Sequence, residues 1–223
     1  MFIAPVDATL GESEWRAFVE SHPFGHLVAP GGPDRQIPVV VPTQFVLVGR
    51  TIWLHLVRAN PVFGALAENP RVLLSVADDW AFIPSAWKAI DNEDPALGIP
   101  TTYYGAVQLV GQARVHDERV APGRVAEILR RQLTAFQPDV EIADPSEAHA
   151  AKLLGILGIE IRLEEVSAKF KYGGNVDPAH RRVVVSRLEG RQGPGDAAVG
   201  AHVVRRLEAA VGEGEDDESP PRL

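Results

Sequence analysis

Short runs of apolar residues dominate the first third of the chain and are separated by glycine, proline and asparagine. The apolar runs cover residues 24–29, 37–41, 45–48, 51–57 and 71–77. Runs of this length between turn-forming residues are typical of β-strands. The pattern therefore predicts a β-rich meander, and we expect this meander to close on itself.

Helical patterns precede and interrupt this meander. Thr9 and Glu12 have the spacing of a capping box, and the apolar residues that follow recur at helical intervals as far as Val19, which predicts a short amphipathic helix. Residues 61–69 begin with proline and place their apolar side chains on one side, which predicts one or two helical turns. The result is a strand–helix–strand unit.

The second half of the chain opens with an irregular segment over residues 85–100, which we expect to form a long loop. Apolar and polar residues then alternate over 102–115, as they do in a half-buried strand. Later periodicity predicts four more helices and one more strand. The helices are expected over 120–136, 146–154, 177–189 and 196–211, and the strand over 159–163.

Composition indicates a globular protein with one core and no general attraction to polyanions. The chain has 223 residues, of which 45% are hydrophobic and 23% charged, and its net charge is −8. From Gly212 onward five acidic residues stand against one arginine, so half of the excess charge lies at this end. A mildly acidic body has no general drive toward DNA or an anionic membrane. We expect neither as a partner.

Several kinds of chemistry are excluded because the residue types or motifs that they need are absent from the sequence. The chain has no cysteine, which excludes disulfides, thiolate metal sites and iron–sulfur clusters. Walker-type loops, Gly-x-Ser-x-Gly elbows and His-Glu-x-x-His pairs are also missing from the sequence. The seven histidines include no pair at metal-ligand spacing on one element. A zinc site made by the protein alone is therefore not expected.

The sequence shows no pattern for export or membrane insertion. Its apolar runs are far shorter than the roughly 18 residues that a membrane span needs. The first 14 residues have no basic region followed by an apolar stretch, so no signal peptide is visible. We expect a cytoplasmic protein.

His55 differs from the other histidines because of the residues that follow it. It lies in the strand predicted over 51–57, faces away from the apolar side, and precedes the turn Arg58-Ala59-Asn60-Pro61. An arginine and an asparagine on a strand-to-helix turn, together with the amides of the helix N-terminus, can hold a phosphate or a carboxylate. The alternative is that His55 is a hydrogen-bonded barrel residue and Arg58 a surface charge.

Aromatic and cationic residues form three further groups. Five aromatic residues bracket the irregular segment, where they could stack on a planar cofactor or belong to the core. Lys169 and Lys171 precede a Gly-Gly-Asn turn, where two cations more often form a solvated face. Six arginines fall between Arg181 and Arg206, but acidic residues alternate with them, so we do not expect nucleic-acid binding. The aromatic residues are Trp80, Phe82, Trp87, Tyr103 and Tyr104.

Taken in order, these segments resemble the PaiB-like family of FMN-binding proteins, from residue 1 to about residue 207. The segment 55–61 is similar to the family's His-x-x-Arg-Ala-Asn-Pro and is the most specific match. Weaker similarities cover 1–5, 81–87, 100–104, 157–161 and 169–171. The resemblance implies a mainly β fold with flanking helices, of the α+β class. More closely, it implies an FMN-binding split β-barrel that forms a homodimer, with two cofactor sites across the interface.

The resemblance also implies a domain organisation and a set of cofactor-binding residues. We expect a cofactor-binding split barrel with inserted helices over 1–175, a helical extension over 176–211, and a disordered acidic tail over 212–223. Arginine, asparagine and lysine side chains would contact the FMN phosphate, and aromatic and hydroxyl side chains would lie near the ring. The expected cofactor-binding residues are His55, Arg58, Asn60, Ser85, Trp87, Thr101, Tyr103 and Lys171.

Our leading hypothesis is an FMN-dependent oxidoreductase that acts on a small molecule, with the cofactor doing the chemistry. No catalytic residue is identified. One alternative is a haem b-dependent enzyme of the piperazate-synthase type, which forms a nitrogen–nitrogen bond, with His55 as axial ligand and sole metal-ligating residue. Another is a PaiB-like transcriptional regulator whose arginine-rich C-terminal helices contact DNA or a partner protein.

The chain departs from the family pattern at several positions. Gln36, Trp80 and Gln108 stand where relatives commonly have histidine, so His55 alone is kept of those four positions. Gly173 and Gly174 replace the Ser-Gln of the closing motif and remove two hydrogen-bonding side chains. These departures predict an altered affinity for flavin.

Overall fold

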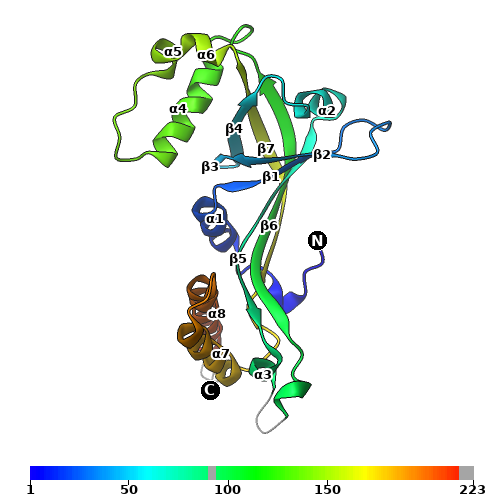
Figure 1. Ribbon diagram of the computed structural model, residues 1–223, viewed down its shortest axis with the longest axis vertical. Coiled ribbons are helices and arrows are strands. Elements are labelled where there is room, and N and C mark those ends of the chain that lie inside the picture. The colour runs from blue at the N-terminus through cyan, green and yellow to red at the C-terminus, as the bar shows by residue number, and fades with distance from the viewer. Residues whose placement is uncertain (90–93, 216–223) are drawn as a thin grey trace, which may run out of the picture. The chain divides into compact units, whose positions relative to one another are not determined.

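Figure 1 shows the computed structural model, which describes residues 1–89 and 94–215, with side chains described as far as residue 209. Two compact units interleave along the chain. Three long strands, β5 (Arg71–Ile83), β6 (Thr101–His116) and β7 (Ile156–Lys171), continue from one unit into the other. The first unit comprises residues 1, 11–76 and 107–167, and the second comprises 2–10, 77–106 and 168–223.

Seven strands form a mostly antiparallel sheet in the order β2-β1-β5-β6-β7-β4-β3. Strand β1 (Phe24–Ala29) pairs antiparallel with β2 (Val39–Gln44) and with β5. Strand β4 (Thr51–Val57) pairs antiparallel with β3 (Val46–Val48) and with β7. The fold is therefore the expected split barrel, mainly β with flanking helices.

The expectation that the strands close on themselves is wrong. Only Phe45 separates β2 from β3, yet the two strands lie at opposite edges of the described sheet. They diverge because β2 follows β1 toward β5, whereas β3 follows β4 toward β7. The Phe45 side chain is 1% exposed, so it is buried at the point where the chain passes from β2, which pairs with β1, to β3, which pairs with β4.

The first unit buries one face of its strands under helices. Helix α1 (Glu12–Ser21) packs Trp15, Phe18 and Val19 inward, at the predicted helical intervals. Its N-cap is Gly11 instead of Thr9, so the predicted capping box between Thr9 and Glu12 is wrong. Glu12 is the first residue of the helix, whereas a capping box would place it three residues after the N-cap. The other helices of this unit are α2 (Val62–Glu68), α4 (Arg124–Phe136), α5 (Pro145–Ala148) and α6 (Ala150–Leu153).

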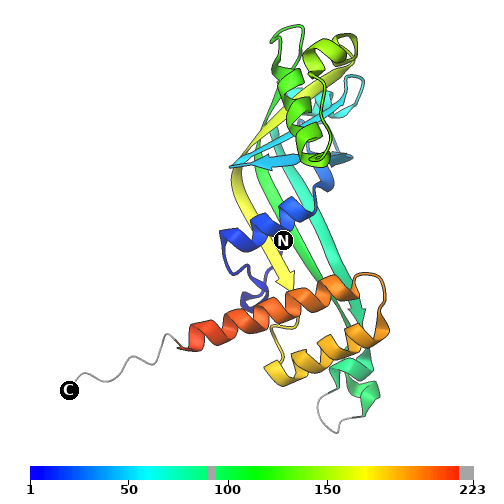
Figure 2. The ribbon, with the colours of Figure 1, turned by 90° about the vertical axis from the view of Figure 1, so that its left-hand side faces the viewer.

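The second unit contains two packed C-terminal helices, α7 (Pro178–Arg191) and α8 (Asp196–Glu215), seen in orange and red in Figure 2. Val184 and Leu188 of α7 and Val199 and Val203 of α8 are buried. Helix α8 continues to Glu215, into the segment expected as a tail, and residues 216–223 lie outside the described residues.

The irregular segment expected over 85–100 contains short helical turns. These are α3 (Ser85–Lys88) and the 3-10 helix η2 (Pro95–Leu97), and residues 90–93 lie outside the described residues. A further 3-10 helix, η1 (Pro5–Asp7), lies near the N-terminus. No helix in the described part of the chain has the length and apolar character of a membrane span.

Candidate functional site

In the first unit, His55 lies in β4 opposite Gly158 of β7, on the side that α4 contacts. Its Nδ1 lies 2.5 Å from Oε1 of the buried Gln132. Gln132 Nε2 donates to the Gln44 carbonyl oxygen at 3.4 Å, which fixes the orientation of the amide because a carbonyl oxygen only accepts. His55 Nδ1 is therefore the donating nitrogen, and in the neutral imidazole Nε2 carries the lone pair.

Arg58 and Asn60, on the following turn, also have protein partners. The Arg58 guanidinium donates to both Asp117 oxygens at 2.6 and 2.7 Å and to the Leu154 carbonyl at 3.0 Å. Its hydrogen bonds hold the pKa of Asp117 well below the ordinary range of a carboxyl group. Asn60 Oδ1 accepts from the Val62 amide at 3.0 Å, in the first turn of α2. The side chains of this turn therefore form hydrogen bonds within the first unit.

In the second unit, the structure brings two predicted site residues into contact. Lys171 Nζ, at the end of β7, donates to Thr101 Oγ1, at the start of β6, at 2.6 Å. Burial and the charge of Lys171 together lower the pKa of the half-buried Lys88 on α3. Among the described residues, no carboxylate forms an ion pair with Lys88 or Lys171. The three residues form a cationic cluster with one hydroxyl.

Tyr103 lies two residues along β6 from Thr101 and is 1% exposed. Its hydroxyl is buried and has no hydrogen-bond partner among the described residues, and burial raises the pKa of Tyr103 to about 12. The ring meets Tyr172 edge-on, with centroids 6.4 Å apart. Gly173 has φ +79°, and a Cβ there would lie 2.3 Å from the Tyr103 hydroxyl oxygen. An orphaned donor of this kind fits a bound acceptor.

Ser85 and Trp87, the remaining predicted residues, belong to the four-residue α3. The Arg191 guanidinium lies over the Trp87 ring, 4.7 Å from its centroid. The predicted site residues thus fall into two groups in two different units. His55, Arg58 and Asn60 lie in the first, and Ser85, Trp87, Thr101, Tyr103 and Lys171 in the second.

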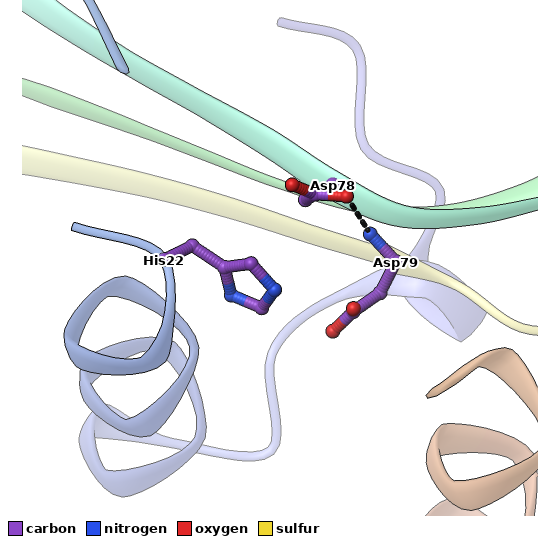
Figure 3. Close-up of side chains that lie close together, drawn as sticks. All are labelled: His22, Asp78 and Asp79. Atoms are coloured by element: carbon purple, nitrogen blue, oxygen red, sulfur yellow. Dashed lines mark hydrogen bonds between the residues drawn. The ribbon is translucent and has the colours of Figure 1, made fainter. Parts of the chain in front are cut away.

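Sequence reasoning missed a buried polar network in the second unit. His202 Nε2 lies 2.8 Å from Asp79 Oδ2, and the His202 ring stacks on Tyr172 with centroids 4.5 Å apart. Asp79 has φ +49°, and its amide donates to Asp78 Oδ1 at 2.8 Å, as Figure 3 shows. Two adjacent aspartates inside a strand are unfavourable for β structure. That anomaly was the available sequence signal.

The C-terminal arginines also have partners within the chain. Arg187 donates to the Ala86 carbonyl, Arg206 to the Ala8 carbonyl, and Arg191 pairs with Asp196. Arg205 hydrogen-bonds His202 at 3.1 Å. Arg187, Arg191 and Arg206 therefore hold α7 and α8 in place, whereas the Arg205 contact lies within α8.

Comparisons with known proteins point to one family. Residues 1–165 match the family described as "Putative FMN-binding domain". The Bacillus subtilis (strain 168) protein named "Protease synthase and sporulation protein PAI 2" is 24% identical over 193 residues, which are 83% of this chain and 87% of that protein.

Two solved structures share the fold. The flavocytochrome Anf3 from Azotobacter vinelandii has a TM-score of 0.55 and 22% identity, over 78% of this chain and 74% of that chain. An FAD and haem binding protein from Mycobacterium smegmatis has a TM-score of 0.55 and 16% identity, over 79% and 78%. At these identities the likeness establishes the split-barrel fold.

Proposed function

Because this chain belongs to the PaiB-like family of FMN-binding domains, we propose that it binds FMN and acts as an FMN-dependent oxidoreductase on a small molecule. When bound, FMN supplies the redox chemistry, and the protein binds and orients the partners of that reaction. We further propose a homodimer. Trp80 and Phe82, on one face of β5, are 58% and 51% exposed and offer an apolar surface for a second copy.

The observation that carries the proposal is the contact between Lys171 and Thr101. A phosphate needs cations and donors, and this pair offers an ammonium group, a hydroxyl and the nearby charge of Lys88. The orphaned Tyr103 hydroxyl, in the same unit, adds a buried donor. These groups fit FMN, and Trp87 offers an aromatic surface for its ring.

In the proposed homodimer, with cofactor sites across the interface, Arg58 and Asn60 of the second copy are proposed as further phosphate contacts. They could bind the phosphate only by giving up their present partners. Arg58 already binds Asp117, so a phosphate would have to replace that carboxylate. Asn60 uses its Oδ1 as a helix cap, which leaves its amide nitrogen as the group to donate. We therefore assign Lys171 the larger share of phosphate binding.

Titration of the full-length protein with FMN, followed by flavin fluorescence, tests this assignment. Lys171→Gln should weaken binding by about tenfold to a hundredfold, or roughly 1.5 to 3 kcal/mol, because a charged hydrogen bond is lost. Lys152→Gln, at an exposed lysine of α6, is the matched control and should bind as the native protein does. Equal affinity in the native protein and Lys171→Gln would overturn the assignment, and unchanged binding in Arg58→Ala would remove Arg58 from the site.

One observation favours a second candidate, a haem b-dependent enzyme of the piperazate-synthase type. Gln132 leaves His55 Nε2 with its lone pair, and histidines that ligate a metal commonly donate their other ring N–H in this way. An absorption spectrum of the native protein separates the candidates, with a Soret band at about 400 nm for haem and bands at about 375 and 450 nm for flavin. His55→Ala should abolish a Soret band and cost flavin binding little.

The regulator hypothesis receives less support. Four of the C-terminal arginines that would contact DNA already donate to groups of their own chain. Contacts of this kind reduce the charge available to phosphates.

A further inference from the structure

The first unit contains an open pocket with a volume of about 540 Å³ beside the first turn of α4. We call it the His116 pocket. None of the residues assigned to the cofactor lines it. Arg114 and His116 come from the end of β6, and Pro122, Gly123, Arg124 and Glu127 come from the start of α4 and the residues before it.

His116 is held by a carboxylate. It is 6% exposed, and its Nε2 lies 3.0 Å from Oε2 of Glu160 on β7. Burial raises the pKa of Glu160, but hydrogen bonds from Arg124 and His116 outweigh burial and hold this pKa below its ordinary value. Glu160 is therefore ionised near neutral pH and can only accept, so His116 Nε2 is the donating nitrogen.

This arrangement leaves His116 Nδ1 as an acceptor. In a neutral imidazole, a proton on Nε2 places the lone pair on Nδ1. Within the described residues no hydrogen bond reaches Nδ1, and His116 lines the pocket. A buried histidine that is oriented by a carboxylate and lines a pocket is a common arrangement of acid–base or ligand-binding histidines.

The charges around the pocket leave one cation without a partner. Arg124 donates to Glu127 and to Glu160, at 2.5 and 2.8 Å, and its guanidinium lies over the Trp53 ring. Glu127 also accepts from Arg131 at 2.8 Å. Arg114 is exposed and forms no ion pair with any described residue. The pocket therefore presents one unpaired positive charge, two positions along β6 from His116, whose Nδ1 accepts when the imidazole is neutral.

We propose that the His116 pocket binds a small hydroxycarboxylate, whose carboxylate pairs with Arg114 and whose hydroxyl donates to His116 Nδ1. A monoanion matches the single unpaired cation. A phosphate dianion would bring a second negative charge close to Glu127 and Glu160. This site is additional to the proposed cofactor site and needs no flavin or haem.

The test compares two monoanions that differ in one hydroxyl, lactate and propionate, on the full-length protein. Each is titrated while the imidazole nitrogen resonances of His116 are followed by NMR. Lactate should shift the Nδ1 resonance and bind about threefold to tenfold more tightly than propionate, the worth of one neutral hydrogen bond. Equal binding of the two acids, or an unmoved Nδ1 resonance, would overturn the proposal.

Two substitutions sharpen the experiment. Arg114→Gln should weaken lactate binding by about tenfold or more, because a charge-assisted contact is lost. Arg119→Gln, at an exposed arginine that does not line the pocket, should leave it unchanged. Lactate binding that survives Arg114→Gln, or falls equally in both variants, would contradict the assignment.

Discussion

Asp117 links the stability of the first unit to pH through its contact with Arg58. The pKa of Asp117 is lower in the folded chain than its ordinary value, so the unfolded chain takes up the proton first as pH falls. The stabilisation is therefore fully present above about pH 4 and is lost progressively below it. Since both side chains are partly exposed, solvent screening keeps this contribution small.

Urea denaturation at pH 7 and pH 3 measures this contribution. Asp117→Asn should lower the free energy of unfolding at pH 7 and reduce the difference between the two pH values. Asp139→Asn, at an exposed aspartate, should leave both quantities as they are in the native protein. A pH dependence that Asp117→Asn leaves intact would mean that other carboxyl groups produce it.

Individual contacts show which parts of the candidate site could be predicted from the sequence. Thr101 and Lys171 were both predicted as cofactor residues, and they touch. The partners of His55 and Arg58 were not predicted, because Gln132 and Asp117 lie 77 and 59 positions further along the chain. Contacts over such separations depend on how the strands pair, which local patterns do not specify.

At the scale of elements, the strands are longer than their patterns predict. Strand β5 was expected to end at residue 77 and β7 to span 159–163, but they reach Ile83 and Lys171. In both, adjacent acidic residues interrupt the alternation, Asp78 and Asp79 in β5 and Glu164 and Glu165 in β7. The alternation is lost where a strand no longer has one buried and one exposed face.

Replacing each of two glycines by alanine should change the free energy of unfolding in opposite directions. Gly173→Ala should lower the free energy of unfolding by about 1 to 3 kcal/mol, because the positive φ and the Tyr103 hydroxyl both oppose a Cβ. Gly190→Ala, in α7 with open space around its Cβ, should raise it by a few tenths to about 1 kcal/mol. Thermal denaturation of both variants checks the pair, and a stabilised Gly173→Ala protein would contradict the packing described here.

At the scale of the whole molecule, the proposed homodimer makes a clear prediction. Trp80→Glu should give a monomer in sedimentation velocity, because a charge would then lie within a buried apolar contact. Val140→Glu, at a valine that is 56% exposed in a loop, should sediment as the native protein does. A native protein that is monomeric at micromolar concentration would contradict the proposal itself.

Three strands carry the main chain across the boundary between the two units. Neither half is therefore a continuous stretch of polypeptide, and no single proteolytic cut can release one half from the other. Gene fusion or fission at one position cannot exchange the halves between relatives. The two halves must be inherited together, and a substitution in one is selected in the presence of the other.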